Sequence, residues 1–180
     1  DIFTPCPECE NGGPGDPRKT SDITGHRQFL IDSTRVANDA FAKIGKKVKV
    51  GYHSMNYDVA MAVMDKETTA AVGGIVAIDH YVRTGEKMIR DIEKLKQQSG
   101  GNIFLGEIGN PIPDIHGQQS EDEQAEWLRQ TLDLLMINKS IVGLNYWVNV
   151  GGSTALWDKT GTPRRAVTIL SSYYTRLINQ

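Results

Sequence analysis

The stretch Asn102–Asn110 reads NIFLGEIGN, an apolar run that brings a single carboxylate, Glu107, to a turn flanked by glycines. A short apolar run bounded by glycines is typical of a buried parallel strand. In α/β architectures, reactive side chains gather where such strands end. Glu107 is therefore the first candidate for a catalytic residue.

Helix-like and strand-like segments alternate along the rest of the chain. Apolar residues at helical spacing, followed by Gly45, predict a helix over about 24–44, and Ser120 with Glu123 forms a capping-box signature at the start of another. Besides the strand that carries Glu107, strands are predicted at 2–3, 48–52, 74–78 and 141–147, and helices around 88–95, 125–135 and 167–177.

This alternation predicts an α/β fold with parallel strands joined by right-handed crossovers. Five strands are fewer than the eight of a closed barrel. We expect a partial (β/α)8 TIM barrel of about five parallel strand-helix units, with residues 1–180 forming a single catalytic-type domain. Because open sheet edges invite pairing, we also expect either a missing barrel half or self-association.

Composition narrows the range of partners. The 180 residues are 39% hydrophobic with no long apolar segment, which indicates one core and no membrane partner. The net charge of −2, with scattered basic residues, argues against a nucleic-acid surface. Cys6 and Cys9 have no second cysteine pair and precede a Gly/Pro-rich loop, which disfavours both zinc binding and redox chemistry. Small or neutral ligands are expected.

Polar and aromatic side chains follow each predicted strand, and parallel strands bring such ends to one rim. They are Glu8 and Glu10, then His53 and Asn56, then Asp79, His80 and Tyr81, then Glu107, and finally Trp147 and Asn149. Two carboxylates beside aromatic rings are what glycoside hydrolysis requires, because one protonates the leaving oxygen while the other attacks the sugar or activates water.

Three segments carry a resemblance to a known family: Leu105–Gly109 (LGEIG), Gly143–Trp147 (GLNYW) and Ala155–Ala166 (ALWDKTGTPRRA). They resemble the seventh strand, the eighth strand and the following loop of the (β/α)8-barrel retaining glycoside hydrolases. In that clan the acid/base Glu ends the fourth strand and the nucleophile Glu ends the seventh. The resemblance implies that the chain corresponds to units four to eight, the C-terminal part of the barrel.

The resemblance also implies roles for individual residues. Glu107 matches the nucleophile, Tyr81 the residue that orients it, and Trp147 the sugar-stacking floor. The remaining implied substrate contacts are His53, Asn56, His80 and Trp157. The implied chemistry uses no metal and no organic cofactor.

The fourth strand departs from the clan's usual Asn-Glu-Pro, because the chain reads PCPECEN at residues 5–11. Glu8 aligns best with the acid/base, and Pro7 stands where the Asn would be. The 2-hydroxyl contact of that Asn would then be missing. Glu10 remains an alternative acid/base.

The predicted function is a glycoside hydrolase that cleaves O-glycosidic bonds of a carbohydrate by retaining double displacement. The alternative is a non-catalytic carbohydrate-binding or structural barrel remnant. A doubly wound nucleotide-binding domain ranks third, because no Gly-x-Gly-x-x-Gly turn follows any predicted strand. Outside the site, Trp127 is expected in helix packing, His26 on the surface at a helix start and His116 in a solvated loop.

Overall fold

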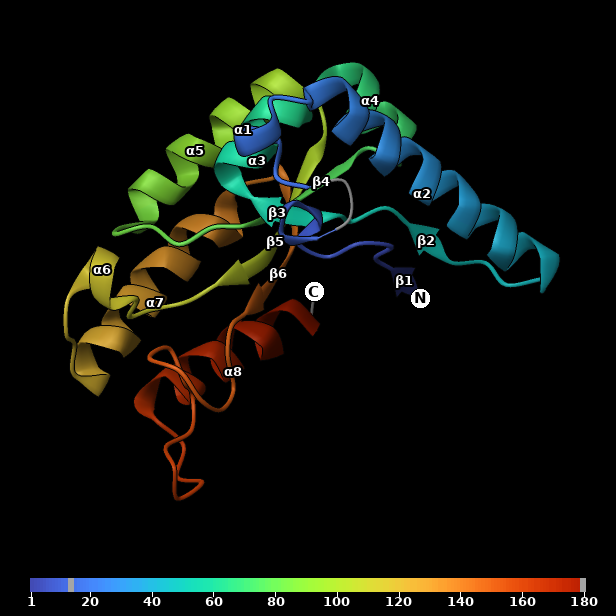
Figure 1. Cartoon of the computed structure of the whole chain (residues 1–180). Helices are drawn as coiled ribbons and strands as arrows, with labels where there is room; N and C mark the ends of the chain where they lie inside the picture. The colour runs from blue at the N-terminus through green and yellow to red at the C-terminus, as the bar shows by residue number, and fades with distance from the viewer. Residues whose placement is uncertain (13–14, 179–180) are drawn as a thin grey trace. The chain divides into compact units, whose positions relative to one another are not determined.

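The computed structural model describes residues 1–12 and 15–178. It is an α/β fold in which strands alternate with helices, as predicted (Figure 1). The chain divides into two compact units, one of residues 1–79 with 92–106 and the other of residues 80–91 with 107–180.

The strands form two sheets. β1 (Ile2–Phe3) pairs in parallel with β2 (Lys49–Val50), and β3 (Ser54–Asn56) pairs in parallel with β4 (Ile75–Asp79). The larger sheet has the hydrogen-bonded order β3-β4-β5-β6, where β5 is Asn102–Ile108 and β6 is Ile141–Tyr146. Within each sheet, strands that follow one another in sequence are therefore neighbours, which is the strand order of a barrel.

The strand predicted over residues 48–52 is wrong in its extent. β2 ends at Val50, because Gly51 and Tyr52 adopt positive φ angles of 124° and 54°, and β3 begins only at Ser54. A Cβ at Gly51 would lie 2.3 Å from the carbonyl oxygen of Val72. Glycine is required at this bend, which separates two strands where the sequence pattern indicated one.

Helices of the first unit include one long element. α2 (Ile23–Lys43) matches the predicted helix; Asp22 caps its start and Gly45, with φ of 67°, follows its end. The shorter elements are η1 (Cys9–Asn11), α1 (Pro17–Thr20), α3 (Tyr57–Val63) and α4 (Lys66–Ala71). α5 (Gly85–Ser99) begins in the second unit and ends in the first.

The second unit contains α6 (Pro113–His116), α7 (Glu121–Ile137) and α8 (Arg165–Ile178). The capping box predicted for α7 is confirmed, since Ser120 and Glu123 bond each other's backbone N–H groups. α7 and α8 pack side by side (Figure 1). Asp122 and Arg165 form an ion pair where the two helices begin.

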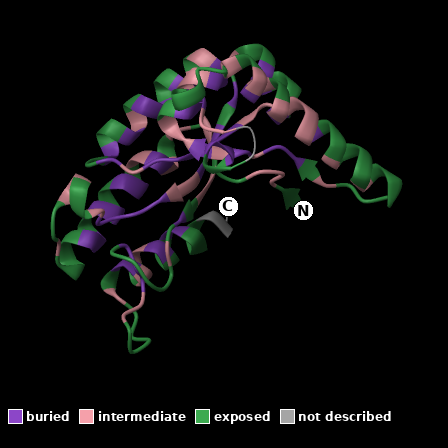
Figure 2. Ribbon diagram, viewed as in Figure 1, coloured by how far each residue is buried: buried purple, intermediate pink, exposed green. Residues whose placement is uncertain are grey.

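Buried residues lie along the strands and on parts of the helices (Figure 2). In the first unit the fully buried residues include Met55, Val59, Ile78, Ile92, Leu95, Ile103 and Leu105. In the second unit they include Met88, Ile108, Leu128, Leu132 and Ala166. The strand that carries Glu107 is thus anchored by apolar residues on both sides of the carboxylate, a rigid support for a reactive group.

Two predictions about histidines are wrong. His26 is only 1% exposed, because α2 turns that side of its first turn toward the core. His116 belongs to α6, where its Nε2 lies 2.9 Å from the carbonyl oxygen of Val82 and its ring packs edge-on against Trp127. Trp127 is buried, so its prediction is confirmed.

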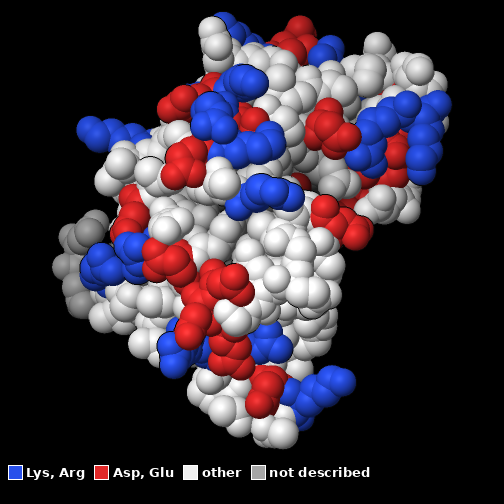
Figure 3. All heavy atoms as spheres, turned by 90° about the vertical axis from the view of Figure 1, so that its left-hand side faces the viewer, with Lys and Arg blue, Asp and Glu red and all other residues white. Residues whose placement is uncertain are grey.

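The two cysteines of the chain, Cys6 and Cys9, are joined in a disulfide. None of the helices within residues 1–12 and 15–178 has the length and apolar character that crossing a bilayer requires. On the face drawn in Figure 3, basic and acidic side chains interleave. Such mixing produces no broad field of one sign on that face.

Candidate active site

Glu107 lies near the end of β5 and is half-buried in the second unit. The Tyr81 hydroxyl donates a hydrogen bond of 2.8 Å to Glu107 Oε2. The backbone N–H of His80 donates to the backbone carbonyl of Glu107 at 2.9 Å. The segment that follows β4 therefore holds Glu107 through both its backbone and its carboxylate, which is the contact that an orienting role for Tyr81 requires.

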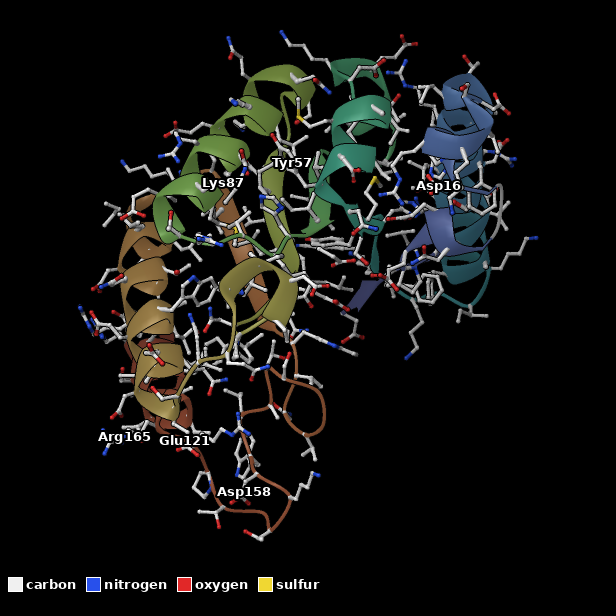
Figure 4. The ribbon with its side chains drawn as sticks, turned by 60° about the vertical axis from the view of Figure 1, so that its left-hand side comes forward. Asp16, Tyr57, Lys87, Glu121, Asp158 and Arg165 are labelled. Atoms are coloured by element: carbon white, nitrogen blue, oxygen red, sulfur yellow. A yellow bond between two sulfur atoms is a disulfide. The ribbon has the colours of Figure 1, made fainter. Side chains whose placement is uncertain are left out.

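His80 is buried, and its Nε2 lies 2.9 Å from Asp91 Oδ2 on α5. The Nζ of Lys87, one helical turn before Asp91, donates a hydrogen bond of 2.6 Å to the same Asp91 oxygen (Figure 4). Burial opposes ionisation of Asp91, but the hydrogen bonds from Lys87 and His80 outweigh it and hold the pKa of this carboxyl below its ordinary value. An ionised Asp91 thus fixes the ring of the residue that precedes Tyr81.

Trp147 follows β6 and is 49% exposed. Its backbone N–H donates to the carbonyl of Ile108, and the Trp147–Val148 peptide bond is cis. A Cβ placed on Gly109 would lie 2.4 Å from the Trp147 carbonyl oxygen and 3.0 Å from the Thr154 side chain. The backbone of the turn after Glu107 therefore packs directly against the backbone of the segment after β6. Gly109 permits this approach because it has no Cβ.

The close approach predicts the effect of Gly109→Ala. The added methyl group must displace backbone rather than a flexible side chain, so the free energy of unfolding should fall by about 1–3 kcal/mol. Thermal and urea unfolding measure it. Gly12→Ala is the control, because a Cβ there meets no atom within 4 Å. Equal stability of Gly109→Ala and the parent would show that these two segments can separate freely.

Trp157 lies in the loop before α8 and is half-buried. It lines an open cavity of about 490 Å³ together with Asn149, Val150 and Asp158. The Asp158 carboxylate closes this loop by accepting the N–H groups of Thr160 and Thr162 (Figure 4). The hydrogen bond from Thr160 is the main cause that holds the pKa of Asp158 below its usual value. The loop thus presents an indole ring beside fixed polar groups.

In the first unit, the two candidate acids differ in environment. Glu8 is exposed, has a left-handed backbone with φ of 46°, and donates its N–H to the carbonyl of Ser54. Glu10 is buried, and its Oε1 accepts the backbone N–H and the side-chain amide of Asn56 at 2.7 and 2.8 Å. The structure therefore brings Glu10 and Asn56 together and leaves the Glu8 carboxylate at the surface.

His53 lies in the interior of the first unit. Its Nε2 is 2.8 Å from the Thr34 hydroxyl of α2. Burial lowers the pKa of His53 to about 4, although a hydrogen bond with the backbone of Cys6 opposes this. The ring is therefore neutral at pH 7 and ties α2 to the segment between β2 and β3.

The lowered pKa of His53 predicts a loss of stability in acid. The unfolded chain binds a proton at this ring below about pH 6.5, whereas the folded chain binds it only near pH 4, so stability falls as pH falls between these values. Between pH 7 and pH 5 this ring alone should remove about 2 kcal/mol from the free energy of unfolding.

The measurement is urea unfolding of the parent and of His53→Gln across that pH range. The variant keeps a polar group for Thr34 but does not titrate, so its stability should depend less on pH. Parallel curves for the two proteins would contradict the assignment.

Several residues of the site were missed by sequence reasoning. Lys87 and Asp91 are spaced i, i+4 on α5, a pattern that could have identified their ion pair. In the part of the chain that the structure describes, no three His, Cys, Asp or Glu side chains gather closely enough to hold a metal ion.

No protein-family model and no curated protein matches the sequence. Solved structures do match its fold. A GH128 (subgroup VII) oligosaccharide-binding protein from Trichoderma gamsii matches with a TM-score of 0.61 and 10% identity, over 99% of this chain and 81% of that one.

A GH128 (subgroup I) endo-β-1,3-glucanase from Amycolatopsis mediterranei matches with a TM-score of 0.60 and 13% identity, over 82% of this chain and 65% of that one. A GH128 (subgroup VI) exo-β-1,3-glucanase from Aureobasidium namibiae matches with a TM-score of 0.56 and 14% identity, over 78% of this chain and 59% of that one. The chain thus spans less than two thirds of the length of either glucanase.

These matches place the chain, by fold, among proteins with the TIM-barrel architecture of glycoside hydrolases. At identities of 10–14% the likeness concerns the fold alone. The chain has a glycosidase-like α/β fold that covers part of such a barrel.

Proposed function

We propose that the chain is the C-terminal part of a retaining glycoside hydrolase barrel, with Glu107 as its nucleophile. The observation that carries the proposal is the setting of Glu107. It is a half-buried carboxylate at a strand end whose Oε2 accepts the Tyr81 hydroxyl, while the next strand ends in an exposed indole, Trp147. A carboxylate held in place by a hydrogen-bond donor is suited to attack on a sugar.

In the proposed reaction, Glu107 attacks the anomeric carbon and forms an ester as the glycosidic C–O bond breaks. The acid/base, proposed to be Glu8, gives its proton to the leaving oxygen. Water then attacks the same carbon and yields its proton to Glu8, which frees Glu107 and restores both carboxyl groups. Two displacements retain the anomeric configuration.

The other predicted substrate-binding residues have different proposed roles. Trp147 and Trp157 present indole faces on which a pyranose ring can stack, whereas Asn56 acts through the Glu10 carboxylate that it binds. His80 and His53 are both more than nine-tenths buried, so they position neighbouring segments rather than touch the sugar.

Proteins of the same fold that hydrolyse β-1,3-glucans motivate the choice of substrate, a β-linked glucose polymer. The test incubates the chain with laminari-oligosaccharides and with aryl β-glucosides and follows the anomeric protons by NMR. We expect the β-anomer to appear first. First appearance of the α-anomer would exclude double displacement, and absence of any turnover would favour carbohydrate binding without catalysis.

Tyr81→Phe tests the orienting contact. It removes one hydrogen bond to a carboxylate, worth about 1.5–3 kcal/mol, so kcat/KM should fall by about 10–100-fold. Tyr174→Phe is the matched control, because Tyr174 is exposed and lies on α8. An unchanged kcat/KM for Tyr81→Phe would mean that Glu107 needs no donor from Tyr81.

The second candidate function is carbohydrate binding without catalysis. One observation favours it specifically: the T. gamsii protein that matches over 99% of this chain is an oligosaccharide-binding protein. The same incubation decides between the two functions. Binding of laminari-oligosaccharides measured by calorimetry, with no product after prolonged incubation, would support this alternative.

A further inference from the structure

A second cavity lies in the second unit, where the segment after β5 and the loop before α8 meet the start of α7. Its volume is about 380 Å³, which falls in the range of about 300–1,000 Å³ typical of small-molecule sites. Its polar lining includes Gln118, Gln119, Glu121, Gln124, Ser153 and Arg164. Glu107, Trp147 and Trp157 are not among its lining residues.

The Gln124 side chain has its orientation fixed by the surrounding backbone. Its Nε2 lies 2.9 Å from the carbonyl oxygen of Asn110, 3.0 Å from that of Thr154 and 3.3 Å from that of Ala155. Carbonyl oxygens only accept hydrogen bonds, so the amide nitrogen must face them. These three carbonyls belong to residues outside the cavity lining, whereas Gln124 itself lines the cavity, and Oε1 takes no part in these bonds.

Gln124 is 1% exposed, and its Oε1 has no hydrogen-bond partner within residues 1–12 and 15–178. A buried acceptor without a donor costs about 1–3 kcal/mol. The same shortage affects two more lining atoms, since Gln119 Oε1 and Arg164 Nε are also buried without a hydrogen bond to the described chain. Residues that line the cavity thus carry two acceptors and one donor that no described residue satisfies.

The charges of the lining cancel. Arg164 Nε lies 4.0 Å from Glu121 Oε1, so the one positive and the one negative side chain face each other at the cavity. Glu121 is the first residue of α7. Arg165, the first residue of α8, pairs with Asp122 and does not line the cavity (Figure 4). A neutral ligand is favoured, because an ion would meet one like charge and one opposite charge at similar range.

We propose that this cavity binds one neutral sugar residue, as a carbohydrate site separate from the candidate active site. Adjacent hydroxyl groups of a pyranose can donate to Gln124 Oε1 and Gln119 Oε1 while another oxygen accepts from Arg164 Nε. The ligand class follows from the cavity itself. It does not depend on the hydrolysis proposed for Glu107.

The test is saturation-transfer NMR on the whole chain carrying Glu107→Gln, with D-glucose and laminaribiose as probes. The Glu107→Gln background prevents turnover, so failure of the proposed hydrolysis leaves this measurement intact. Ser153→Trp fills the cavity from an exposed position, and Gln119→Ala removes one acceptor. Either change should weaken binding by about tenfold, whereas Gln97→Ala, at an exposed position on α5, should not.

Three outcomes would overturn the proposal. The first is loss of the probe signal with Trp147→Ala but not with Ser153→Trp or Gln119→Ala, which would place the sugar at the candidate active site. The second is absence of any signal at millimolar probe, which would mean that water alone fills the cavity. The third is an equal signal from glucuronate that is lost with the same variants, which would contradict a neutral ligand.

Discussion

Replacing Glu107 with glutamine should lower kcat/KM for an aryl β-glucoside by more than about 10⁴-fold, because an amide cannot form the glycosyl ester. Stability should change by less than about 1 kcal/mol, since glutamine has the same shape and can still accept the Tyr81 hydroxyl. Steady-state kinetics and thermal unfolding measure the two effects.

Glu67→Gln serves as the control for this substitution, since Glu67 is exposed on α4. A covalent trap sharpens the result. A 2-fluoro glucoside should label the parent on the peptide that contains Glu107 and should not label Glu107→Gln. Activity of Glu107→Gln within about tenfold of the parent would exclude Glu107 as the nucleophile.

The second large effect concerns the acid/base. With a natural sugar as leaving group, Glu8→Ala should lower the rate of glycosylation by about 10²–10⁴-fold, the usual contribution of general acid catalysis. With a dinitrophenyl glucoside the loss should be far smaller, because that leaving group departs without a proton. Stopped-flow release of the phenol measures this step.

Glu10→Ala is the comparison variant, because it separates chemistry from structure. The Glu10 carboxylate accepts two hydrogen bonds from Asn56. Removing this carboxylate should therefore destabilise the first unit and lower the glycosylation rate equally with both leaving groups. If Glu10→Ala instead shows the dependence on leaving group expected of Glu8→Ala, then Glu10 is the acid/base and the assignment of Glu8 is wrong.

Elements with strong local signals were predictable from sequence. α2 has a long apolar period ended by Gly45, and α7 starts at a capping box, so both helices were predicted within a few residues. β5 and β6 were predicted for a similar reason, since each is an apolar run bounded by turn residues.

Short elements were not predictable. α3 and α4 have seven and six residues, too few for an amphipathic period to appear, and the Asn56 side chain does not cap α3. At the break between β2 and β3, Gly51 lies close to the backbone of Val72, which is twenty-one residues further along the chain. Such a contact leaves no local trace beyond a glycine.

The candidate site shows the same division. Glu107, Tyr81 and Trp147 could be predicted as site residues because each lies at or just after the end of an apolar strand, and the Tyr81 contact was expected from the resemblance. The hydrogen-bond partners of the buried polar groups could not be predicted from the sequence. Glu10 meets Asn56, His53 meets Thr34, and Gln124 meets Asn110 only because tertiary packing joins distant segments.

The Gln124 amide has a consequence for motion. Its nitrogen bonds both to the carbonyl after β5, at Asn110, and to the carbonyls before α8, at Thr154 and Ala155. Two surface loops normally open independently and exchange their amide hydrogens at separate rates. Here the Gln124 side chain bonds to both loops, so their openings are coupled. A substitution that loosens one loop therefore also increases the rate at which the amide hydrogens of the other loop exchange with deuterium.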